Sequence, residues 1–294
     1  MELSLKNVLS LYGLQDFQTT KVVRHKDRRL ELATGAGLFE LLERRINGKP
    51  LIEWYQSIQS KNVFKACERI ISFYSNYHAQ TVLLGVFTCR GFAGGDLPPR
   101  LPHPIFYEDA HFHYDLERDA RFSDLENRLV IEWGESHINW HQHLHNKDKA
   151  VLEILPIGYL MPFPGFDRVM LTFAQLRYLV QHEMGNREWV QRLAGVNGIY
   201  LITDQKDSEQ YVGAAYGESS DVGGIWGRWR QYATTNGTGG NLGLTEKLLK
   251  CPDKAHDLLF SILQITDKSS RTAVLKLEQT WKEKLGTHVH GLNR

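Results

Sequence analysis

The sequence predicts an α+β protein built from two domains. Its 294 residues, of which 42% are hydrophobic, suffice for a sizeable core, and this length favours two domains over one. Runs rich in β-branched residues fill the middle of the chain, and the last third combines further such runs with helical periods. We therefore expect an N-terminal, mixed α/β, barrel-like domain over residues 1–190. A C-terminal domain over residues 191–294 should hold a small three-stranded antiparallel sheet flanked by helices.

Helices are expected at the start of the N-terminal domain. One helical period runs from about Gly37 to Ile46 and ends at a glycine, and a second covers residues 60–78. The apolar residues that carry the second period are Val63, Phe64, Cys67, Ile70, Ile71 and Tyr74.

The middle of the chain predicts strands. Residues 81–89, 128–133 and 150–159 are β-rich runs, and Gly/Pro-rich segments separate them. We expect a sheet or a small barrel here. Two helices, at 171–182 and 186–193, then lead into the C-terminal domain.

A basic segment and a group of histidines are candidate functional features of the N-terminal domain. The segment from Lys21 to Arg29 has five Lys or Arg residues and one acid. Its candidate phosphate contacts are Lys21, Arg24, Arg28 and Arg29, and the alternative is an ordinary solvated strand or loop. The histidines are His111, His113, His137, His141, His143 and His145. The alternation of His141, His143 and His145 is not the pattern of a helical zinc motif, and no cysteines accompany these residues, which favours surface or phosphate-facing side chains over a metal site.

Composition limits the classes of function. The formal net charge is +1, so any nucleic-acid surface must be local. Cys67, Cys89 and Cys251 are scattered without a CxxC pair, which supports neither a disulfide framework nor a cysteine zinc site. No signal peptide is recognisable, and no stretch approaches the roughly 20 apolar residues that span a bilayer. We expect a soluble protein of the reducing cytoplasm, with no membrane partner.

The C-terminal domain begins with a predicted hairpin. Residues 198–203 and 209–213 are β-branched and aromatic runs on either side of a polar turn, so Tyr200 and Tyr211 should stand on neighbouring strands. A third strand is expected at 256–266.

Helices are expected around this sheet. Residues 223–233 have a helical period on which Arg228 and Tyr232, four residues apart, share an edge. Residues 269–286 form a later helix with Glu278 beside its apolar stripe, and 241–250 a helix between these two. The glycine-rich loop before residue 241 could approach a phosphate, but such loops are more often flexible connections.

These motifs together resemble the GIY-YIG nuclease superfamily. The match is ordered: GIY at 198–200, YVG at 211–213, Arg228 followed by Trp229, Glu278 on a later helix, and Asn293 near the end. Each motif alone is weak, and each residue alone has an ordinary interpretation as a sheet aromatic, a solvated acid or a surface charge. The ordered set covers roughly the last third of the chain.

The resemblance implies a catalytic site. Its members would be Tyr200, Tyr211, Arg228, Tyr232, Glu278 and Asn293. Tyr200 would be the general base, Tyr211 would orient water or phosphate, and Arg228 would stabilise the phosphate charge. Tyr232 stands where family members often carry histidine and would be a proton relay or a second base. Glu278 would hold Mg²⁺, which Mn²⁺ could replace, and Asn293 would fix the geometry of the site.

The implied function is a metal-dependent DNA endonuclease of restriction or defence type. Lys206 and Arg230, with the basic segment, would contact double-stranded DNA, and the N-terminal domain would select the target. A nuclease module at the C-terminus favours a restriction-type or modification-dependent enzyme, and double-strand cleavage implies a homodimer. The alternatives are a structure-selective repair nuclease and a DNA-binding protein without catalysis.

Overall fold

A computed structural model of the chain describes residues 3–25, 41–42, 44–75, 80–94, 112–134, 140–216, 223–266 and 271–293. The chain divides into an N-terminal unit, Met1–Leu155, and a C-terminal unit, Pro156–Arg294. This division lies well before the boundary expected near residue 190. The reason is that Leu176, Leu179 and Trp189, on the helices expected in the junction, are buried in the core of the C-terminal unit.

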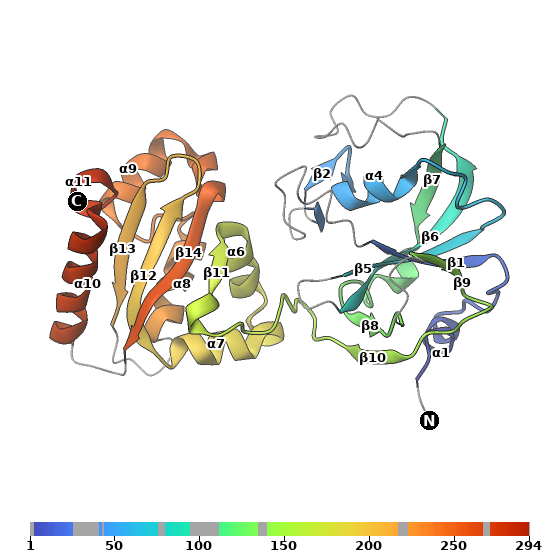
Figure 1. The fold of residues 1–294 in the computed structure, drawn as a ribbon, viewed down its shortest axis with the longest axis horizontal. Coiled ribbons are helices and arrows are strands. Elements are labelled where there is room, and N and C mark those ends of the chain that lie inside the picture. The colour runs from blue at the N-terminus through green and yellow to red at the C-terminus, as the bar shows by residue number, and fades with distance from the viewer. Residues whose placement is uncertain are drawn as a thin grey trace. The chain divides into compact units, whose positions relative to one another are not determined.

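The N-terminal unit is built on a mixed eight-stranded sheet that curls in Figure 1. Its described strands are β1 (Thr20–His25), β4 (Ile58–Gln59), β5 (Arg69–Ser75), β6 (Thr81–Phe92), β7 (Phe112–Arg118), β8 (Leu129–Ile131), β9 (His141–His143) and β10 (Val151–Ile154). The order is β10-β8-β6-β5-β1-β9, and β7 pairs with both β6 and β4. Strands β1 and β5 are parallel, and the other described pairs of the sheet are antiparallel.

Shorter elements complete the N-terminal unit. They are helices α1 (Leu5–Leu11) and α4 (Leu51–Ser57), a 3-10 turn at Ala120–Phe122, and the separate pair β2 (Arg45–Ile46) and β3 (Lys49–Pro50). Ser4 caps α1 through a capping box with Asn7, which fixes where this short helix begins. Leu5 and Leu9 of α1 are buried with the apolar residues of one sheet face, whereas α4 lies on the other side of the sheet (Figure 1).

The helix expected over residues 60–78 is wrong, because residues 69–75 form strand β5. This strand lies between β1 and β6, and Ile70, Ile71 and Phe73 are all fully buried. A strand that is buried on both faces has no polar alternation, so its apolar run also fits a helical period. Half of the residues of the helix expected from Gly37 to Ile46 lie outside the described residues; of the others, Leu41 and Leu42 are helical, and the last two form β2. The β-rich runs of the middle are confirmed as β6, β8 and β10.

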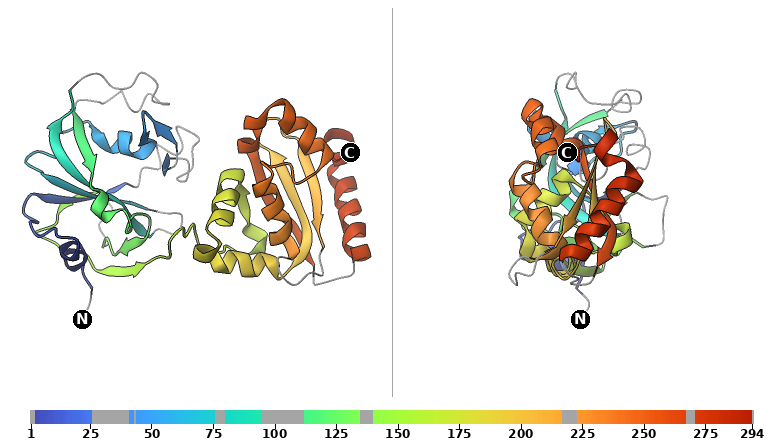
Figure 2. Two further views of the ribbon diagram at one scale, coloured as in Figure 1. Left: turned by 180° about the vertical axis from the view of Figure 1, so that it is seen from behind. Right: turned by 90° about the vertical axis from the view of Figure 1, so that its left-hand side faces the viewer.

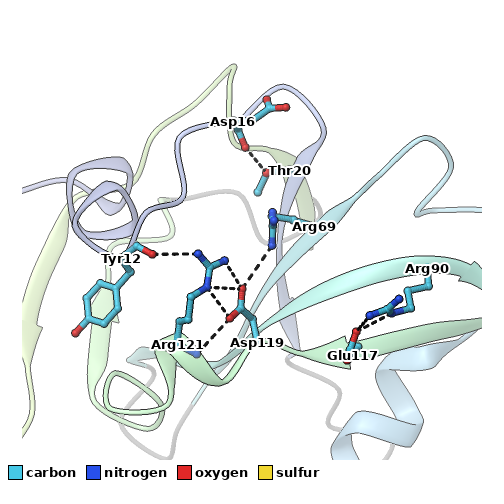
Figure 3. Close-up of polar contacts among 8 residues, drawn as sticks. All are labelled: Tyr12, Asp16, Thr20, Arg69, Arg90, Glu117, Asp119 and Arg121. Atoms are coloured by element: carbon cyan, nitrogen blue, oxygen red, sulfur yellow. Dashed lines mark hydrogen bonds and ion pairs between the residues drawn. The ribbon is translucent and has the colours of Figure 1, made fainter.

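Asp119 ties three parts of the N-terminal unit together (Figure 3). Its carboxylate accepts a hydrogen bond from Arg121 at 2.6 Å and lies 3.5 Å from Arg69 of β5. Arg121 in turn donates to the backbone oxygen of Tyr12, just after α1, at 3.3 Å. The hydrogen bond from Arg121 lowers the pKa of Asp119, so this carboxylate stays charged and holds the turn against the sheet.

The C-terminal unit contains an antiparallel four-stranded sheet in the order β11-β14-β12-β13. Its strands are β11 (Met170–Thr172), β12 (Asn197–Asp204), β13 (Gln210–Ala215) and β14 (Leu258–Thr266). Its α-helices are α6 (Phe173–Gln181), α7 (Arg187–Ala194), α8 (Gly224–Thr234), α9 (Leu242–Lys250), α10 (Arg271–Leu285) and α11 (Thr287–His290). Short 3-10 turns lie at Phe166–Arg168, Glu183–Asn186 and Pro252–Asp257.

Helices cover both faces of this sheet, with α10 on one side and α6, α8 and α9 on the other (Figures 1 and 2). Because side chains alternate along a strand, Ile199 of β12 packs with Val274 of α10, while Tyr200 and Ile202 enter the core that includes α8. The expected hairpin is present as β12 and β13, the expected third strand as β14, and the expected helices flank the sheet. The fourth strand, β11, was not expected, because it is three residues long and the helical period begins directly after it.

Cys67, Cys89 and Cys251 are free thiols. Within the described ranges, no helix is both long and apolar enough to cross a bilayer.

Candidate active site

The hairpin places Tyr200 and Tyr211 on the same face of the C-terminal sheet. Tyr200 pairs with Gly213 and Ile202 with Tyr211, so both phenols project towards α8. Gly213 makes this possible, because a Cβ at that position would overlap the ring and hydroxyl of Tyr200. The last residue of the YVG motif is therefore a glycine so that the Tyr200 ring can lie across the neighbouring strand.

Helix α8 brings Arg228 and Tyr232 to the Tyr200 hydroxyl. Arg228 Nε donates to Tyr200 Oη at 3.1 Å, and Arg228 Nη2 lies 3.5 Å from Tyr232 Oη. The two hydroxyl oxygens are 2.9 Å apart, and both tyrosines are fully buried. The i, i+4 spacing thus allows one guanidinium to serve two phenols, with its carbon 5.0 Å from the Tyr232 ring centroid.

The loop after α8 closes around the same guanidinium. Arg228 Nη1 donates to Gly239 O at 3.0 Å and to the side chain of Gln231. Gly239 has a φ of +52°, and a Cβ there would overlap the Tyr232 ring. At the end of the loop, Asn241 Oδ1 accepts from Tyr211 Oη at 2.7 Å and from Arg228 Nη2 at 3.3 Å. Its amide nitrogen donates to Tyr232 Oη at 2.6 Å.

A pocket of about 460 Å³ opens over these side chains. Its lining residues are Tyr200, Tyr211, Ala214, Ala215, Tyr216, Gly223, Gly224, Gly227, Arg228, Gln231, Asn241 and Glu278. Among the described lining residues, the only carboxylate is that of Glu278, which belongs to α10 and pairs with Lys282 at 2.7 Å. Four of the six expected catalytic residues therefore line one pocket, and a fifth, Tyr232, is hydrogen-bonded directly behind it.

The protonation states follow from burial and from Arg228. Burial raises the pKa of Tyr200, Tyr211 and Tyr232, and the positive charge of Arg228 opposes the rise in each case. Burial also disfavours the charged form of Arg228, but its interaction with Tyr200 and Tyr232 outweighs this, and its pKa is raised. At neutral pH the pocket therefore holds neutral phenols around a permanent cation.

Asn293 lies outside the pocket and holds β13 in place. Its side-chain oxygen accepts from Val212 N at 2.8 Å, and its side-chain nitrogen donates to Val212 O at 2.7 Å. Strand β13 ends the sheet order, so the Asn293 amide pairs with backbone groups as a further strand would. Leu292 N extends this pairing to Gln210 O at 2.8 Å. Asn293 thus supports the strand that carries Tyr211.

The expected DNA contacts of the C-terminal unit do not line the pocket. Lys206, at the hairpin turn, pairs with Asp257 at 3.2 Å, and Arg230 pairs with Glu183 at 3.3 Å. Both side chains remain partly exposed, so a contact with DNA there would compete with an ion pair.

The expected basic patch of the N-terminal unit requires correction. Lys21 and Arg24 lie on β1 and are 7% and 9% exposed. Lys21 donates to the backbone oxygen of Val63, and Arg24 stacks on the Trp133 ring at 4.9 Å. The cause is the central position of β1 between β5 and β9, which buries every residue of this strand. The expected contacts Arg28 and Arg29 lie outside the described residues.

The described histidines form no metal site. Across the described ranges, no group of three or more His, Cys, Asp or Glu residues is arranged to hold a metal ion. Burial lowers the pKa of His113, His141 and His143, so these imidazoles favour their neutral form. The expected members His111 and His137 lie outside the described residues.

The pocket suits a divalent cation that binds one protein carboxylate and takes its other ligands from water and the phosphates of a substrate. Mg²⁺ commonly binds through one or two carboxylates and completes its coordination with water and substrate phosphates. Glu278 supplies one such carboxylate, which Lys282 now neutralises. A divalent cation at Glu278 would replace this ion pair.

Sequence reasoning missed Asn241, which contacts three of the expected site residues. The available signal was its position, since an asparagine directly before a helical period is a typical N-cap. The loop before it could only be described as a glycine-rich connection. Four of its residues, Asn236, Gly237, Gly239 and Gly240, have positive φ, and this path brings Asn241 back to the pocket.

Comparisons with known proteins add little. No protein-family model and no curated protein matches the chain. Among solved structures, a mutant form of the catalytic domain of intron endonuclease I-TevI is similar, with a TM-score of 0.27 and 20% sequence identity. The match covers 33% of this chain and 92% of that chain. A similarity at this level says nothing about the activity of this protein, and a function must be inferred from the pocket.

Proposed function

We propose that the protein is a metal-dependent endonuclease that hydrolyses DNA phosphodiester bonds in the pocket of its C-terminal unit. One observation carries the proposal: Tyr200, Tyr211, Arg228 and Glu278, from four separate elements, line the same pocket. These are the residues, in order along the chain, on which the resemblance to the GIY-YIG nucleases depends. If each were an ordinary sheet or surface residue, there would be no reason for the four side chains to line one pocket.

Arg228 stabilises negative charge in this reaction. All its donor positions are engaged in the free protein, but the two Nη2 contacts, at 3.3 and 3.5 Å, are the longest. A phosphate oxygen in the pocket would share the Nη2 hydrogens with these two contacts and leave Nε and Nη1 in place. The guanidinium is thus held in position before the substrate binds, which favours electrostatic stabilisation of the transition state.

Tyr200 takes the proton of the attacking water. As a phenolate it would accept this proton, the resulting hydroxide would attack phosphorus, and the bond to the leaving 3′ oxygen would break. Hydrogen bonds from Arg228 and Tyr232 would stabilise the phenolate form. Because burial raises the pKa of Tyr200, the phenolate is scarce at neutral pH, and the cleavage rate should increase with pH. Tyr211 orients water or phosphate from the other strand.

Glu278 is the ligand for the divalent cation, Mg²⁺ or Mn²⁺. When bound, such a cation would neutralise phosphate charge and stabilise the leaving oxygen. Glu278 itself contributes a carboxylate that is 12% exposed and faces the same pocket as Arg228. Opposite charges on two sides of the pocket suit a substrate that is an anion and arrives with a cation.

The biological setting we propose is restriction or defence, on double-stranded DNA and as a homodimer. A single pocket contains one set of catalytic residues, so cutting both strands at one site requires two copies of the chain. The N-terminal unit would select the target, through surfaces other than the buried Lys21 and Arg24.

The test is cleavage of long DNAs, unmodified, methylated and hypermodified, by wild type, Glu278→Gln and Glu283→Gln in the presence of Mg²⁺. Glu283 is an exposed glutamate on the same helix and provides the matched control. We expect discrete fragments from wild type and Glu283→Gln, and none from Glu278→Gln or after chelation of the metal. Cleavage by Glu278→Gln at the wild-type rate would refute the catalytic assignment. DNA binding without cleavage by wild type would refute the enzyme proposal.

A further inference from the structure

Asn241 occupies a helix N-cap but does not cap the helix. It precedes α9 with the extended backbone of an N-cap, φ −88° and ψ 133°, yet its side chain makes no capping hydrogen bond. Asparagine is among the best N-cap residues, and its side-chain oxygen normally accepts from the first turn. Here the amide lines the pocket instead. The side chain therefore gives up a local stabilising contact for contacts with Tyr211, Arg228 and Tyr232.

Arg228 fixes the orientation of this amide. A guanidinium can only donate, so the Asn241 atom that faces Arg228 Nη2 must be the oxygen. The nitrogen must then face Tyr232, where it donates to the hydroxyl at 2.6 Å. Tyr211 donates to the same amide oxygen at 2.7 Å.

This orientation sets the direction of the neighbouring hydrogen bonds. Tyr232 Oη accepts from Asn241 Nδ2 and faces Arg228 Nη2, so both of its acceptor positions are used. Its own hydrogen is then left for another phenol, and Tyr200 Oη, 2.9 Å away, is an acceptor in competition with Tyr211. Tyr200 Oη also accepts from Arg228 Nε. The hydrogen of Tyr200 is thus directed away from both partners, towards the pocket that Tyr200 lines.

We propose that Asn241 is a positioning residue that acts through Tyr232, orienting its hydroxyl so that it donates to Tyr200. This inference rests on the proposed function, since it assigns Asn241 to the support of the proposed general base. Without the hydrogen bond from Asn241 Nδ2, the Tyr232 hydroxyl has a free acceptor position and can turn its hydrogen away from Tyr200. The phenolate of Tyr200 would lose part of its stabilisation, and its pKa would rise further.

The first test compares pH–rate profiles of DNA cleavage by wild type, Asn241→Leu, Asn241→Asp and Asn236→Asp. The leucine removes all hydrogen bonds of the Asn241 side chain, the aspartate removes only the donor and adds negative charge, and Asn236 is an exposed asparagine of the same loop. We expect both Asn241 variants to lose about tenfold in kcat at neutral pH, corresponding to about one unit in the pKa of Tyr200. Because the pKa of Tyr200 lies far above neutral pH, both Asn241 variants should keep the increase of rate with pH that wild type shows, displaced by the same factor at each pH, while KM for DNA and the Asn236→Asp profile stay unchanged. A raised KM, a rate that no longer increases with pH, or wild-type kinetics would overturn the inference.

A second test needs no cleavage, so it separates failure of this inference from failure of the proposed function. In protein with carbon-13 at the tyrosine Cζ atoms, the chemical shift of each phenol reports its hydrogen bonds, and Tyr→Phe variants assign the signals. Asn241→Leu should move the signals of Tyr232 and Tyr200 together, and Asn236→Asp should move neither. A change confined to Tyr232, or no change at all, would overturn the inference even if wild type cleaves DNA.

Discussion

The hydroxyl oxygens of Tyr200 and Tyr232 lie 2.9 Å apart and share one guanidinium, that of Arg228. One tyrosine comes from a strand and the other from a helix, and both are fully buried. The cation that contacts both phenols also lines the pocket, so the pair is not packed in purely apolar surroundings. The pair forms the part of the site whose properties can be tested most directly.

The cleavage rate should depend unequally on the two tyrosines. Tyr200→Phe removes the proposed base and should lower kcat about a hundredfold or more, the usual contribution of a general base. Tyr232→Phe removes the contacts of its hydroxyl with Tyr200, Asn241 and Arg228 but leaves the proposed base in place, and should cost about tenfold. Tyr12→Phe, in the N-terminal unit, removes a hydrogen bond to Asp124 and serves as the control. Equal activity of wild type and Tyr200→Phe in single-turnover assays would exclude Tyr200 as the base.

Stability should fall in alkaline solution. In the unfolded chain a tyrosine ionises near its ordinary pKa of 10.0, whereas burial raises the folded pKa of Tyr200 and Tyr232. Above about pH 10 the unfolded state therefore binds fewer protons, and the free energy of unfolding decreases by about 1.4 kcal/mol per pH unit for each such group. Urea unfolding followed by tryptophan fluorescence at a series of pH values measures this slope. Tyr200→Phe should make it shallower, and an unchanged slope would contradict the raised pKa.

Gly213→Ala should inactivate the protein. The added methyl group would overlap the ring and hydroxyl of Tyr200, so either the ring leaves Arg228 or the strands separate. The cost is of the order of 1–3 kcal/mol in stability, as for other overpacked sites, together with most of the cleavage activity. Gly94→Ala is a suitable control, because an added Cβ there has no neighbour within 4 Å among the described residues. Retention of full activity by Gly213→Ala would mean that the position of Tyr200 is not critical.

The sequence predicts the hairpin and helices of the C-terminal unit well, because their signals are local. Turn residues separate β12 from β13, and the bulky residues of α8 recur at helical spacing. Strand β5 was taken for a helix because burial on both faces removes the alternation that identifies a strand. The unit boundary was misplaced for a related reason: nothing local reveals that α6 and α7 pack on the C-terminal core.

The sequence predicts only those site residues that belong to motifs with a recognisable order along the chain. The expectation that Lys21 and Arg24 contact DNA was wrong, because a count of basic residues cannot distinguish an exposed strand from a central one. Asn241 could not be placed, because its approach to Tyr232 depends on a loop with several residues at positive φ. Such a path follows from tertiary contacts, not from spacing.

Asn293 should matter for stability more than for chemistry. Its amide pairs with both backbone groups of Val212 and is 4% exposed, so Asn293→Ala leaves a buried N–H and a buried C=O without a partner. We expect a loss of about 2–6 kcal/mol, from roughly 1–3 kcal/mol for each of the two unsatisfied groups. Asn293→Asp should be nearly as damaging, because its carboxylate can accept from Val212 N but would repel Val212 O.

Hydrogen exchange followed by mass spectrometry locates this effect. Peptides over β13 should exchange faster in both Asn293 variants, whereas peptides of the N-terminal unit should exchange as in wild type. Because Tyr211 lies on β13, cleavage should fall as this strand opens, and it should recover at lower temperature, where the strand is paired again. Wild-type exchange over β13 combined with lost cleavage would instead place Asn293 in the reaction itself.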